Sequence, residues 1–293
     1  SAARTNQKIM NQCNFHILKY NTIMIFGAHM STAKGFAQAA RKSADEYGAN
    51  ALQFFVKNPR GRSSRPLAAE EADEFKKICK EKKIQFAIAH ASYLVNLAKK
   101  SSEVPWLIDD VAGDFERVWM LGGQGVVVHL GKASGGMSEE EAIKNMIENI
   151  EKILRKTEYT RLMFMLENTA GQKSDLGYRF EELAKIWKKI HPLSSRMKIC
   201  LDTQRAWAAG YDWDDADGIF RKFDELIGVQ HLGCLHFNDS KKPLGSRVDR
   251  HENLFEGLIG EKNLIKIARF AKRQGIPFIL ETPGDKNGDH HGE

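Results

Sequence analysis

The sequence predicts a single (β/α)8 barrel of the TIM type, an α/β fold in which eight parallel strands alternate with helices. Eight short apolar runs recur along the chain, and amphipathic helical patterns lie between them. No stretch rich in Pro, Gly or Ser divides the 293 residues into separate domains. Eight strands that alternate with helices favour a closed barrel over an open sheet.

Each apolar run is four to six residues long and is bounded by polar residues or glycine, which is typical of a buried parallel strand. In order, the runs cover residues 23–28, 51–56, 86–89, 126–130, 162–166, 197–201, 232–237 and 277–280.

Clear helical patterns occupy residues 68–83, 138–156, 180–190 and 262–274. Ser138 and Glu141 form a capping box that predicts the start of the second of these helices. We assign residues 22–284 to the barrel, residues 1–21 to an N-terminal extension outside the fold, and residues 285–293 to a polar tail. Because the chain stops twelve residues after Glu281, we expect it to lack the last helix of a complete barrel.

The composition limits the kinds of binding partner and the cellular locations that fit this protein. A net charge of +6 is compatible with a polyanionic partner. No apolar stretch approaches the ~18 residues that span a bilayer, so no membrane association is expected. The 4 cysteines contain no C-x-x-C pair, which argues against a disulfide framework. We expect a reducing, intracellular location, in the cytoplasm, the nucleus or an organelle.

Seven of the eight runs deliver a His, Asp or Glu at their C-terminal ends, and in a barrel these ends all meet at one mouth. Such a set of buried acids and imidazoles is very unfavourable unless cations bind among them. The seven residues are His29, His90, His129, Glu167, Asp202, His236 and Glu281.

Mixed His and carboxylate ligands fit zinc or manganese and argue against calcium. Asp249 and His251 follow in the next loop, which gives more ligands than one tetrahedral ion needs, so at least two metals are expected. Two ions about 3.5–4 Å apart can clamp a phosphodiester for hydrolysis. We keep His29 outside the ligand set, either as a partner that orients a ligand or as a structural residue.

Several stretches resemble endonuclease IV, the zinc-dependent apurinic/apyrimidinic endonuclease family. The most specific are Glu-Asn-Thr-Ala-Gly at residues 167–171 and Gly-Ser-Arg-Val-Asp-Arg-His at residues 245–251. The resemblance runs from about residue 23 to residue 282, and six further stretches occur in the family order. They lie at residues 27–31, 90–97, 129–131, 201–212, 236–239 and 280–282.

The resemblance implies a trinuclear zinc site. Two zinc ions share the bridging carboxylate of Glu167, and a third is held by the loop after the seventh strand. The residues that match the family ligands are His90 and His129 for the first zinc, Asp202, His236 and Glu281 for the second, and Asp249 and His251 for the third.

One position departs from the family pattern. The family has a zinc-binding His two residues after Thr203, and here that position is Arg205. A guanidinium has no lone pair to give and stays protonated, so it cannot bind zinc. We therefore expect two zinc ions, with Arg205 partly replacing the third cation and contacting Asp249 and the scissile phosphate. The alternatives are a third zinc completed by phosphate and water, or an impaired site.

The family also implies a kinked duplex with the abasic nucleotide flipped out of the stack. Its inserting positions match Arg60, Tyr93 and Leu94. Independently, residues 58–65 form a basic loop that suits phosphate contacts, although most such loops are only solvated surface. Lys241, Lys242, Arg247 and Arg250 make a second basic loop near the mouth.

By resemblance, the expected activity is hydrolysis of the phosphodiester 5′ to an abasic site, with a 3′-hydroxyl and a 5′-deoxyribose phosphate as products, and trimming of blocked 3′ ends. Glu167 and Arg205 are the expected catalytic residues, double-stranded DNA is the expected partner, and we expect a monomer. One rival hypothesis is a metal-dependent sugar isomerase or epimerase, which predicts a small closed pocket. The other is a protein that binds abasic sites without cutting them.

Overall fold

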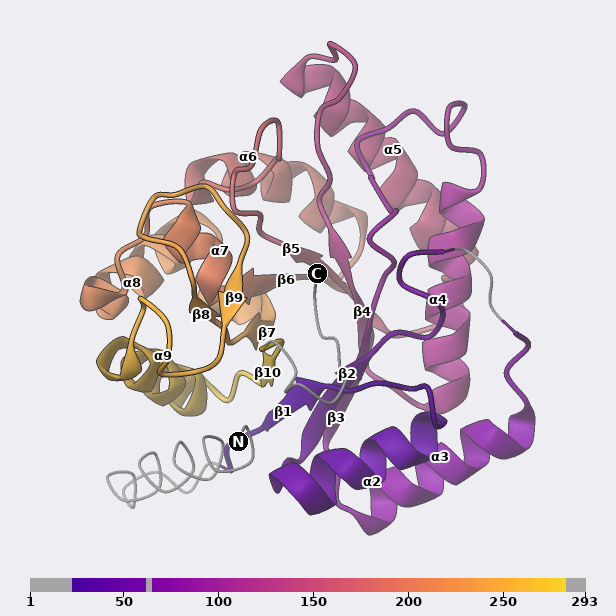
Figure 1. Cartoon of the computed structure of the whole chain (residues 1–293). Coiled ribbons are helices and arrows are strands. Elements are labelled where there is room, and N and C mark those ends of the chain that lie inside the picture. The colour runs from indigo at the N-terminus through magenta and orange to yellow at the C-terminus, as the bar shows by residue number, and fades with distance from the viewer. Residues whose placement is uncertain (1–22, 62–64, 283–293) are drawn as a thin grey trace.

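The computed structural model describes residues 23–61 and 65–282, and in it eight parallel strands close into a barrel surrounded by helices (Figure 1). The predicted fold class is confirmed, and each of the eight apolar runs overlaps one strand. The barrel strands are β1 (Phe26–His29), β2 (Ala51–Phe54), β3 (Phe86–His90), β4 (Gly125–His129), β5 (Met163–Glu167), β6 (Met197–Asp202), β7 (Leu232–His236) and β10 (Phe278–Leu280).

Each barrel strand pairs with the barrel strand that comes next along the chain. The last strand, β10, lies between β7 and β1 and closes the ring. Phe278 is the register partner of Phe26 on one side and of Leu235 on the other. All these pairings are parallel, so the C-terminal ends of the eight strands share one rim.

The helices form the outer layer, with α2 and α3 next to each other at the bottom of the view and α4 and α5 along its right side (Figure 1). The four predicted helices are confirmed as α3, α5, α6 and α9. The helices are α2 (Phe36–Tyr47), α3 (Ala69–Glu81), α4 (Leu107–Leu121), α5 (Glu139–Lys156), α6 (Phe180–Ile190), α7 (Thr203–Ala208), α8 (Ala216–Leu226) and α9 (Glu261–Gln274), with 3-10 turns at η1 (His191–Leu193), η2 (Trp213–Asp215) and η3 (Val229–His231).

The predicted capping box of α5 is present, since the Ser138 Oγ accepts a hydrogen bond from the Glu141 backbone N–H at 3.2 Å. Between β7 and α9 the chain forms a small antiparallel ribbon of β8 (Asp239–Ser240) and β9 (His251–Glu252). This ribbon lies on the side of the barrel where the strands end, so it brings the segment that contains Asp249 and His251 to the mouth.

The core has two layers. One lies between strands and helices, and the other fills the barrel interior beneath the strand ends. The interior layer consists of fully or almost fully buried side chains and forms an apolar floor for whatever lies above it. Its members are Ala51, Phe86, Ile88, Val127, Met165, Cys200, Cys234 and Ile279.

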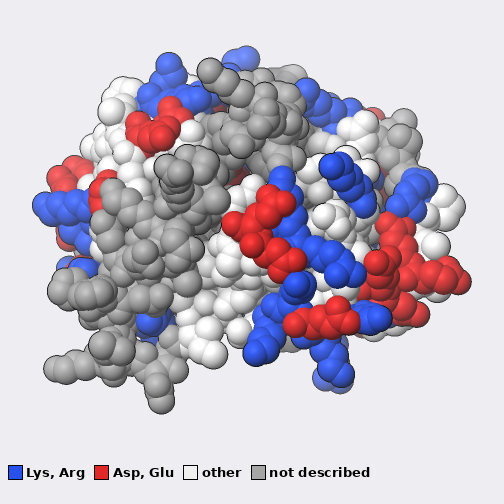
Figure 2. All heavy atoms as spheres, turned by 60° about the horizontal axis from the view of Figure 1, so that its bottom comes forward, with Lys and Arg blue, Asp and Glu red and all other residues white. Residues whose placement is uncertain are grey.

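Charged side chains of both signs are interspersed on the face that Figure 2 turns toward the reader, the face that carries α2 and α3. Ion pairs of Lys82 with Asp45 at 2.7 Å and of Arg41 with Glu74 at 3.9 Å connect α2 with α3. No helix of the described residues is long and apolar enough to cross a membrane.

The predicted extension at residues 1–21, the polar tail at residues 285–293 and the expected loss of a final helix all concern segments outside the described residues. These assignments stay predictions. The described residues 23–61 and 65–282 fall within the segment that the sequence assigns to the barrel.

Candidate metal centre at the barrel mouth

The strand ends bring the predicted ligands to one place. β3, β4, β5, β6 and β7 each end on a predicted ligand, and one more follows β10 directly. The apolar stretch of each strand buries its backbone, and the next residue projects a polar side chain into the mouth. These six residues are His90, His129, Glu167, Asp202, His236 and Glu281.

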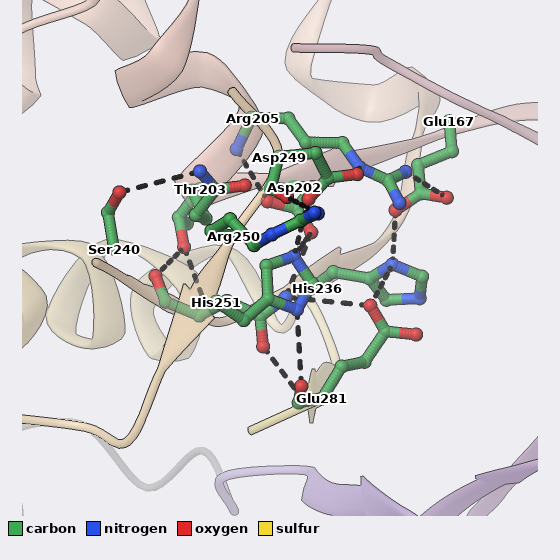
Figure 3. Close-up of polar contacts among 12 residues, drawn as sticks. Glu167, Asp202, Thr203, Arg205, His236, Ser240, Asp249, Arg250, His251 and Glu281 are labelled. Carbon is green, nitrogen blue, oxygen red and sulfur yellow. Dashed lines mark hydrogen bonds and ion pairs between the residues drawn. The ribbon is translucent and has the colours of Figure 1, made fainter. Parts of the chain in front are cut away.

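Glu167 lies at the centre of this arrangement. Its Oε2 is 3.2 Å from the His90 Nε2 and 3.0 Å from the His129 Nε2, while its Oε1 is 2.5 Å from the His236 Nδ1. The carboxylate is fully buried. It therefore faces one pair of imidazoles with one oxygen and a third imidazole with the other (Figure 3 shows the His236 side).

The first ligand group consists of His90, His129 and Glu167, whose ligand atoms all lie within 4.8 Å of one another. The His90 Nδ1 donates to the Ala91 carbonyl at 2.7 Å, which leaves its Nε2 lone pair directed at the group. The His129 Nε2 is buried and accepts or donates no hydrogen bond among the described residues. Two ligands of one tetrahedral zinc with bonds of about 2.0 Å lie roughly 3.3 Å apart, so these separations suit a zinc ion.

The second ligand group consists of Glu167, Asp202, His236 and Glu281, which also meet within 4.8 Å and are all buried. The His236 Nδ1 lies 3.1 Å from the Glu281 Oε2. Three carboxylates around one imidazole make a strongly negative pocket, which a divalent cation would neutralise.

Two amide side chains orient these ligands, and neither is among the site residues predicted from the sequence. Gln53 of β2 accepts from the His236 Nε2 at 2.8 Å and donates to the Glu281 Oε1 at 2.6 Å. Asn238 donates to the Asp202 Oδ2 at 2.8 Å and accepts from the Glu281 backbone N–H at 2.8 Å. The only signal for Gln53 is a polar residue inside the apolar run 51–56.

His29 lies beside the ligand set. Its Nδ1 is 3.0 Å from the Gln53 Nε2 and 3.8 Å from the Glu281 Oε1. Burial lowers the pKa of His29, against the opposing effect of Glu281, so the ring is neutral and accepts from Gln53. Of the two interpretations that the sequence left open, the geometry supports a partner that helps to orient Glu281 through Gln53.

Beneath the second group, the thiols of Cys200 and Cys234 lie 3.4 Å apart in the barrel interior. Both are fully buried. Burial, followed by the neighbouring Cys234, raises the pKa of Cys200 well above its ordinary value, so that thiol stays protonated. The pair forms part of the apolar floor, as small buried hydrophobic residues do.

Arg205 lies between the two ligand groups and the loop after β7 (Figure 3). Its Nη1 is 2.6 Å from the Glu167 Oε2, and its Nε donates to the Asp249 Oδ2 at 3.0 Å. Asp202 caps α7 by accepting from the Arg205 backbone N–H at 2.8 Å, and this fixes where the guanidinium starts. The expected contact between Arg205 and Asp249 is therefore present.

The third metal site fits poorly. The His251 Nε2 lies 3.3 Å from the Asp249 Oδ1 and 3.4 Å from the Asp202 Oδ2, but in the part of the chain that the structure describes these residues form no three-ligand group of the kind found twice at the mouth. Arg205, the residue at the family's remaining ligand position, cannot donate a lone pair. Its guanidinium instead neutralises the charge of Asp249 and Glu167.

The charges of the site depend on one another. Burial works to raise the pKa of Glu167, but Arg205 and His236 hold it well below its ordinary value. Burial lowers the pKa of His236, yet Glu281 and Glu167 outweigh it and raise that pKa to about 10. The carboxylates therefore create a field in which positive charge is strongly favoured at this position, whether carried by a proton or by a metal.

The three predicted DNA-contact residues lie in the loops that follow β2 and β3. Arg60 is exposed in the loop after β2, and Tyr93 and Leu94 are 38% and 47% exposed in the loop after β3. The Tyr93 ring centroid lies 6.2 Å from those of both His90 and His129. The Tyr93 ring therefore lies beside the first ligand group, while residues 62–64 of the basic loop are outside the described residues.

A closed parallel barrel whose mouth gathers imidazoles and carboxylates defines a TIM-barrel protein with a candidate polynuclear metal centre. Residues 41–293 match the family described as xylose isomerase-like TIM barrel. The chain is 37% identical over 262 residues to a probable endonuclease 4 of Chloroflexus aurantiacus, which covers 88% of this chain and 91% of that protein. It is 36% identical to a probable endonuclease 4 of Cenarchaeum symbiosum, over 92% of this chain and 96% of that protein.

The structure of endonuclease IV from Thermus thermophilus superposes with a TM-score of 0.79 at 34% identity, covering 89% of this chain and 93% of that one. This chain belongs to the endonuclease IV family. A D-psicose 3-epimerase also superposes, with a TM-score of 0.67 over 91% of this chain and 89% of that one, but at 15% identity it shares the fold alone.

Proposed function

We propose that this protein is a zinc-dependent apurinic/apyrimidinic endonuclease of DNA repair. It hydrolyses the phosphodiester 5′ to an abasic site in double-stranded DNA, leaving a 3′-hydroxyl and a 5′-deoxyribose phosphate, and it also trims blocked 3′ ends. The observation that carries the proposal is the buried ligand set centred on Glu167, in a chain that belongs to the endonuclease IV family. We propose that it acts as a monomer inside the cell.

Two zinc ions fit the residues at the mouth. His90, His129 and Glu167 would hold one, and Asp202, His236 and Glu281 would hold the other together with Glu167. When bound, two such ions supply a nucleophilic water of lowered pKa and neutralise charge on the phosphodiester. Asp249 and His251 would stabilise this cationic centre from the loop side without completing a third site.

Glu167 and Arg205 are the proposed catalytic residues. Glu167 directs one oxygen toward each ligand group, so it fixes the separation of the two positions and the orientation of the substrate between them. Arg205 has five N–H donors, of which the contacts with Glu167 and Asp249 use two. We propose that the guanidinium also donates to the scissile phosphate and stabilises the charge that develops on the departing 3′-oxygen.

Arg60, Tyr93 and Leu94 are the proposed DNA-contact residues. An exposed aromatic ring and an exposed aliphatic side chain beside a ligand group suit insertion into the gap left by a missing base, where unstacking costs least. Arg60 suits a phosphate contact at the same border of the mouth.

The decisive experiment is incision of a duplex oligonucleotide that contains one tetrahydrofuran abasic analogue, with undamaged duplex as the control. The analogue cannot undergo β-elimination, so any cut must be hydrolytic. We expect one product with a 3′-hydroxyl, lost after chelation and restored by zinc. Binding without cutting would instead indicate a non-catalytic damage binder, and neither binding nor cutting would favour a sugar isomerase or epimerase.

A further inference from the structure

We propose that Lys57 is a positioning residue that holds the two DNA-contact segments, residues 58–61 and 92–94, together as one rigid unit. The inference rests on the proposed function, because it concerns how Arg60, Tyr93 and Leu94 are presented to DNA. Lys57 lies in the segment just after β2, and its ammonium contacts carboxylates of α4.

The charge of Lys57 is used inside the protein. Its side chain is 5% exposed, and its Nζ lies 2.7 Å from both the Asp110 Oδ2 and the Asp114 Oδ1. The same Nζ donates to the Asp110 backbone carbonyl at 3.0 Å. Lys57 thus donates two hydrogen bonds to Asp110, one to its carboxylate and one to its carbonyl, and forms an ion pair with Asp114. Lys57 therefore attaches the loop after β2 to helix α4 rather than offering a cation to solvent.

The loop beyond Lys57 is joined to the next loop by its backbone. The Pro59 carbonyl accepts from the Ser92 Oγ at 2.7 Å and from the Tyr93 backbone N–H at 3.1 Å. The Asn58 Oδ1 accepts from the Arg60 backbone N–H at 2.9 Å, which closes the turn. A movement at Lys57 would thus be transmitted through Pro59 to Tyr93 and Leu94.

Val56 packs into the core, and beyond it the side of the loop that faces α4 is partly open. A hollow of about 380 Å³ lies there, lined by Lys57, Trp106, Asp110, Asp114 and Arg117 among its residues. Side chains that border a hollow make few of the contacts that define the position of a packed core residue. The ion pairs of Lys57 with Asp110 and Asp114 therefore supply a direct polar connection between the loop and α4.

A unit fixed in advance loses less conformational freedom when DNA binds, and a displacement of about 1 Å at such contacts can cost a large part of the rate or affinity. Because the ligand groups lie on the strands themselves, loss of this connection should weaken DNA binding without disturbing the metal centre. The effect should also be distinct from the loss of a phosphate contact, since Lys57 is already neutralised.

The test compares Lys57→Met and Ser92→Ala with the matched control Lys222→Met, whose ammonium pairs with Glu181 on the outer helices. The measurements are the Kd for the tetrahydrofuran duplex over a salt series, KM and kcat, and zinc per chain. We expect Lys57→Met to raise Kd and KM roughly tenfold, with kcat within about twofold of the wild type. Ser92→Ala should give a smaller rise, and zinc content and the Lys222→Met variant should match the wild type.

The salt series separates positioning from charge. Each phosphate contact contributes about −0.9 to the slope of log K against log salt concentration, so Arg60→Gln should reduce the magnitude of that slope by about 1. Lys57→Met should leave the slope unchanged. A slope reduced as in Arg60→Gln would make Lys57 a phosphate contact and overturn the inference.

A folded Lys57→Met variant with wild-type Kd would also overturn it. If Lys57→Met does not fold, because it leaves Asp110 and Asp114 buried without a cation, Ser92→Ala decides, and an unchanged Kd there would be the contrary result. If the wild type binds the abasic duplex but does not cut it, the proposed catalytic function fails while the Kd comparison still tests the role of Lys57.

Discussion

Arg205 places a permanent positive charge between Glu167 and Asp249, where the family pattern has a metal ligand. The replacement exchanges a removable cation for a covalently attached one. It also ties the charge of the site to helix α7, whose first turn Asp202 caps. The positive charge beside Glu167 and Asp249 therefore belongs to a side chain that no change in metal supply can remove.

Replacing Arg205 with His should convert the centre to three zinc ions. The imidazole would supply the lone pair that guanidinium lacks and would complete a site with Asp249 and His251. Zinc per chain, measured by elemental analysis without DNA, should rise from two to three. The control is Arg205→Gln, which removes the charge without adding a ligand and should keep two. Three tight zinc ions in the wild type would contradict the two-zinc proposal.

Replacing Gln53 with Ala should weaken zinc binding by about 10–100-fold, because the amide holds the ring of His236 and the carboxylate of Glu281 in place. Competition with a chromophoric chelator would measure the affinity. Gln274→Ala, at the exposed end of α9, is the matched control and should bind zinc as the wild type does. Equal affinities for both variants would show that Gln53 has no part in orienting the ligands.

At the scale of the elements, the backbone of the segment from β8 to α9 is held by hydrogen bonds to one carboxylate, that of Asp239. Asp239 accepts backbone hydrogen bonds from Ser240 at 2.8 Å, Ile259 at 2.9 Å and Phe255 at 3.1 Å. A buried carboxylate satisfied by several N–H groups organises a loop that has little regular structure of its own. The same loop contains Asp249 and His251, and the pairing of Ser240 with His251 joins it to the segment that Asp239 organises.

Asp239→Asn should lower the free energy of unfolding by about 1–3 kcal/mol, because an amide nitrogen would face N–H donors that now have a carboxylate oxygen. Urea denaturation monitored by fluorescence would measure the change. The control Asp217→Asn lies on the surface, where the Asp217 side chain is 86% exposed, and should leave the denaturation midpoint unchanged. A midpoint for Asp239→Asn equal to that of the wild type would contradict the proposed role.

The strands could be predicted because each is a short apolar run between polar boundaries. Helices α3, α5, α6 and α9 could be predicted because their apolar residues recur with the helical period and form one continuous face. Helix α2 was not predicted, since its buried face consists largely of Ala37, Ala39, Ala40 and Ser43, which give little contrast with the polar face. Helix α4 buries Asp114 among its apolar residues, and that breaks the expected period. Such helices depend on tertiary contacts that a single sequence does not display.

The ligand residues at the mouth could be predicted more completely than the helices around the barrel. The reason is that parallel strands that end on His, Asp or Glu must bring those residues together. The roles of the two amides Gln53 and Asn238 could not be predicted, because they arise from hydrogen bonds with residues of other segments. The attachment of Lys57 to Asp110 and Asp114 joins residues more than fifty positions apart along the chain, and only the packing of α4 against the barrel creates it.

At the scale of the molecule, the buried Lys57 cluster should make stability depend on pH. Burial raises the pKa of Asp114 to about 7, although Lys57 opposes the shift. The folded state then binds this proton more tightly than the unfolded chain, whose pKa is about 3.9. Below about pH 4 Asp114 is protonated in both the folded and the unfolded chain, so it adds no pH dependence. Between about pH 4 and pH 7 only the folded chain keeps the proton, so the free energy of unfolding should fall as pH rises through this window.

Comparison of the wild type with Asp114→Asn in urea between pH 4 and pH 8 would measure this dependence. The difference in unfolding free energy should shift in favour of the variant as pH rises through the window, and it should level off above pH 7. The control is Asp109→Asn, in the same helix but with a side chain 68% exposed, and the dependence should be larger for Asp114→Asn than for this variant. A flat profile for Asp114→Asn would contradict a raised pKa.

Metal removal should destabilise the whole barrel. The site confines several carboxylates in a buried space, and bound cations stabilise only the folded chain that assembles it. The melting temperature should therefore fall on prolonged chelation and recover when zinc is added back, as followed by differential scanning fluorimetry. Glu281→Gln should show a smaller zinc-dependent shift, and an equal shift would place the stabilising zinc elsewhere.

The last barrel strand, β10, pairs with both β7 and β1 and is followed directly by Glu281. A chain still emerging from the ribosome, or a collapsed intermediate with an open sheet, would hold most of the ligands but not this carboxylate. The second ligand group exists only once the ring is complete. Pairing of β10 with β7 and β1 thus completes the ligand set. A chain with an open sheet should therefore be unable to cleave DNA, and it should gain this activity only when the barrel closes.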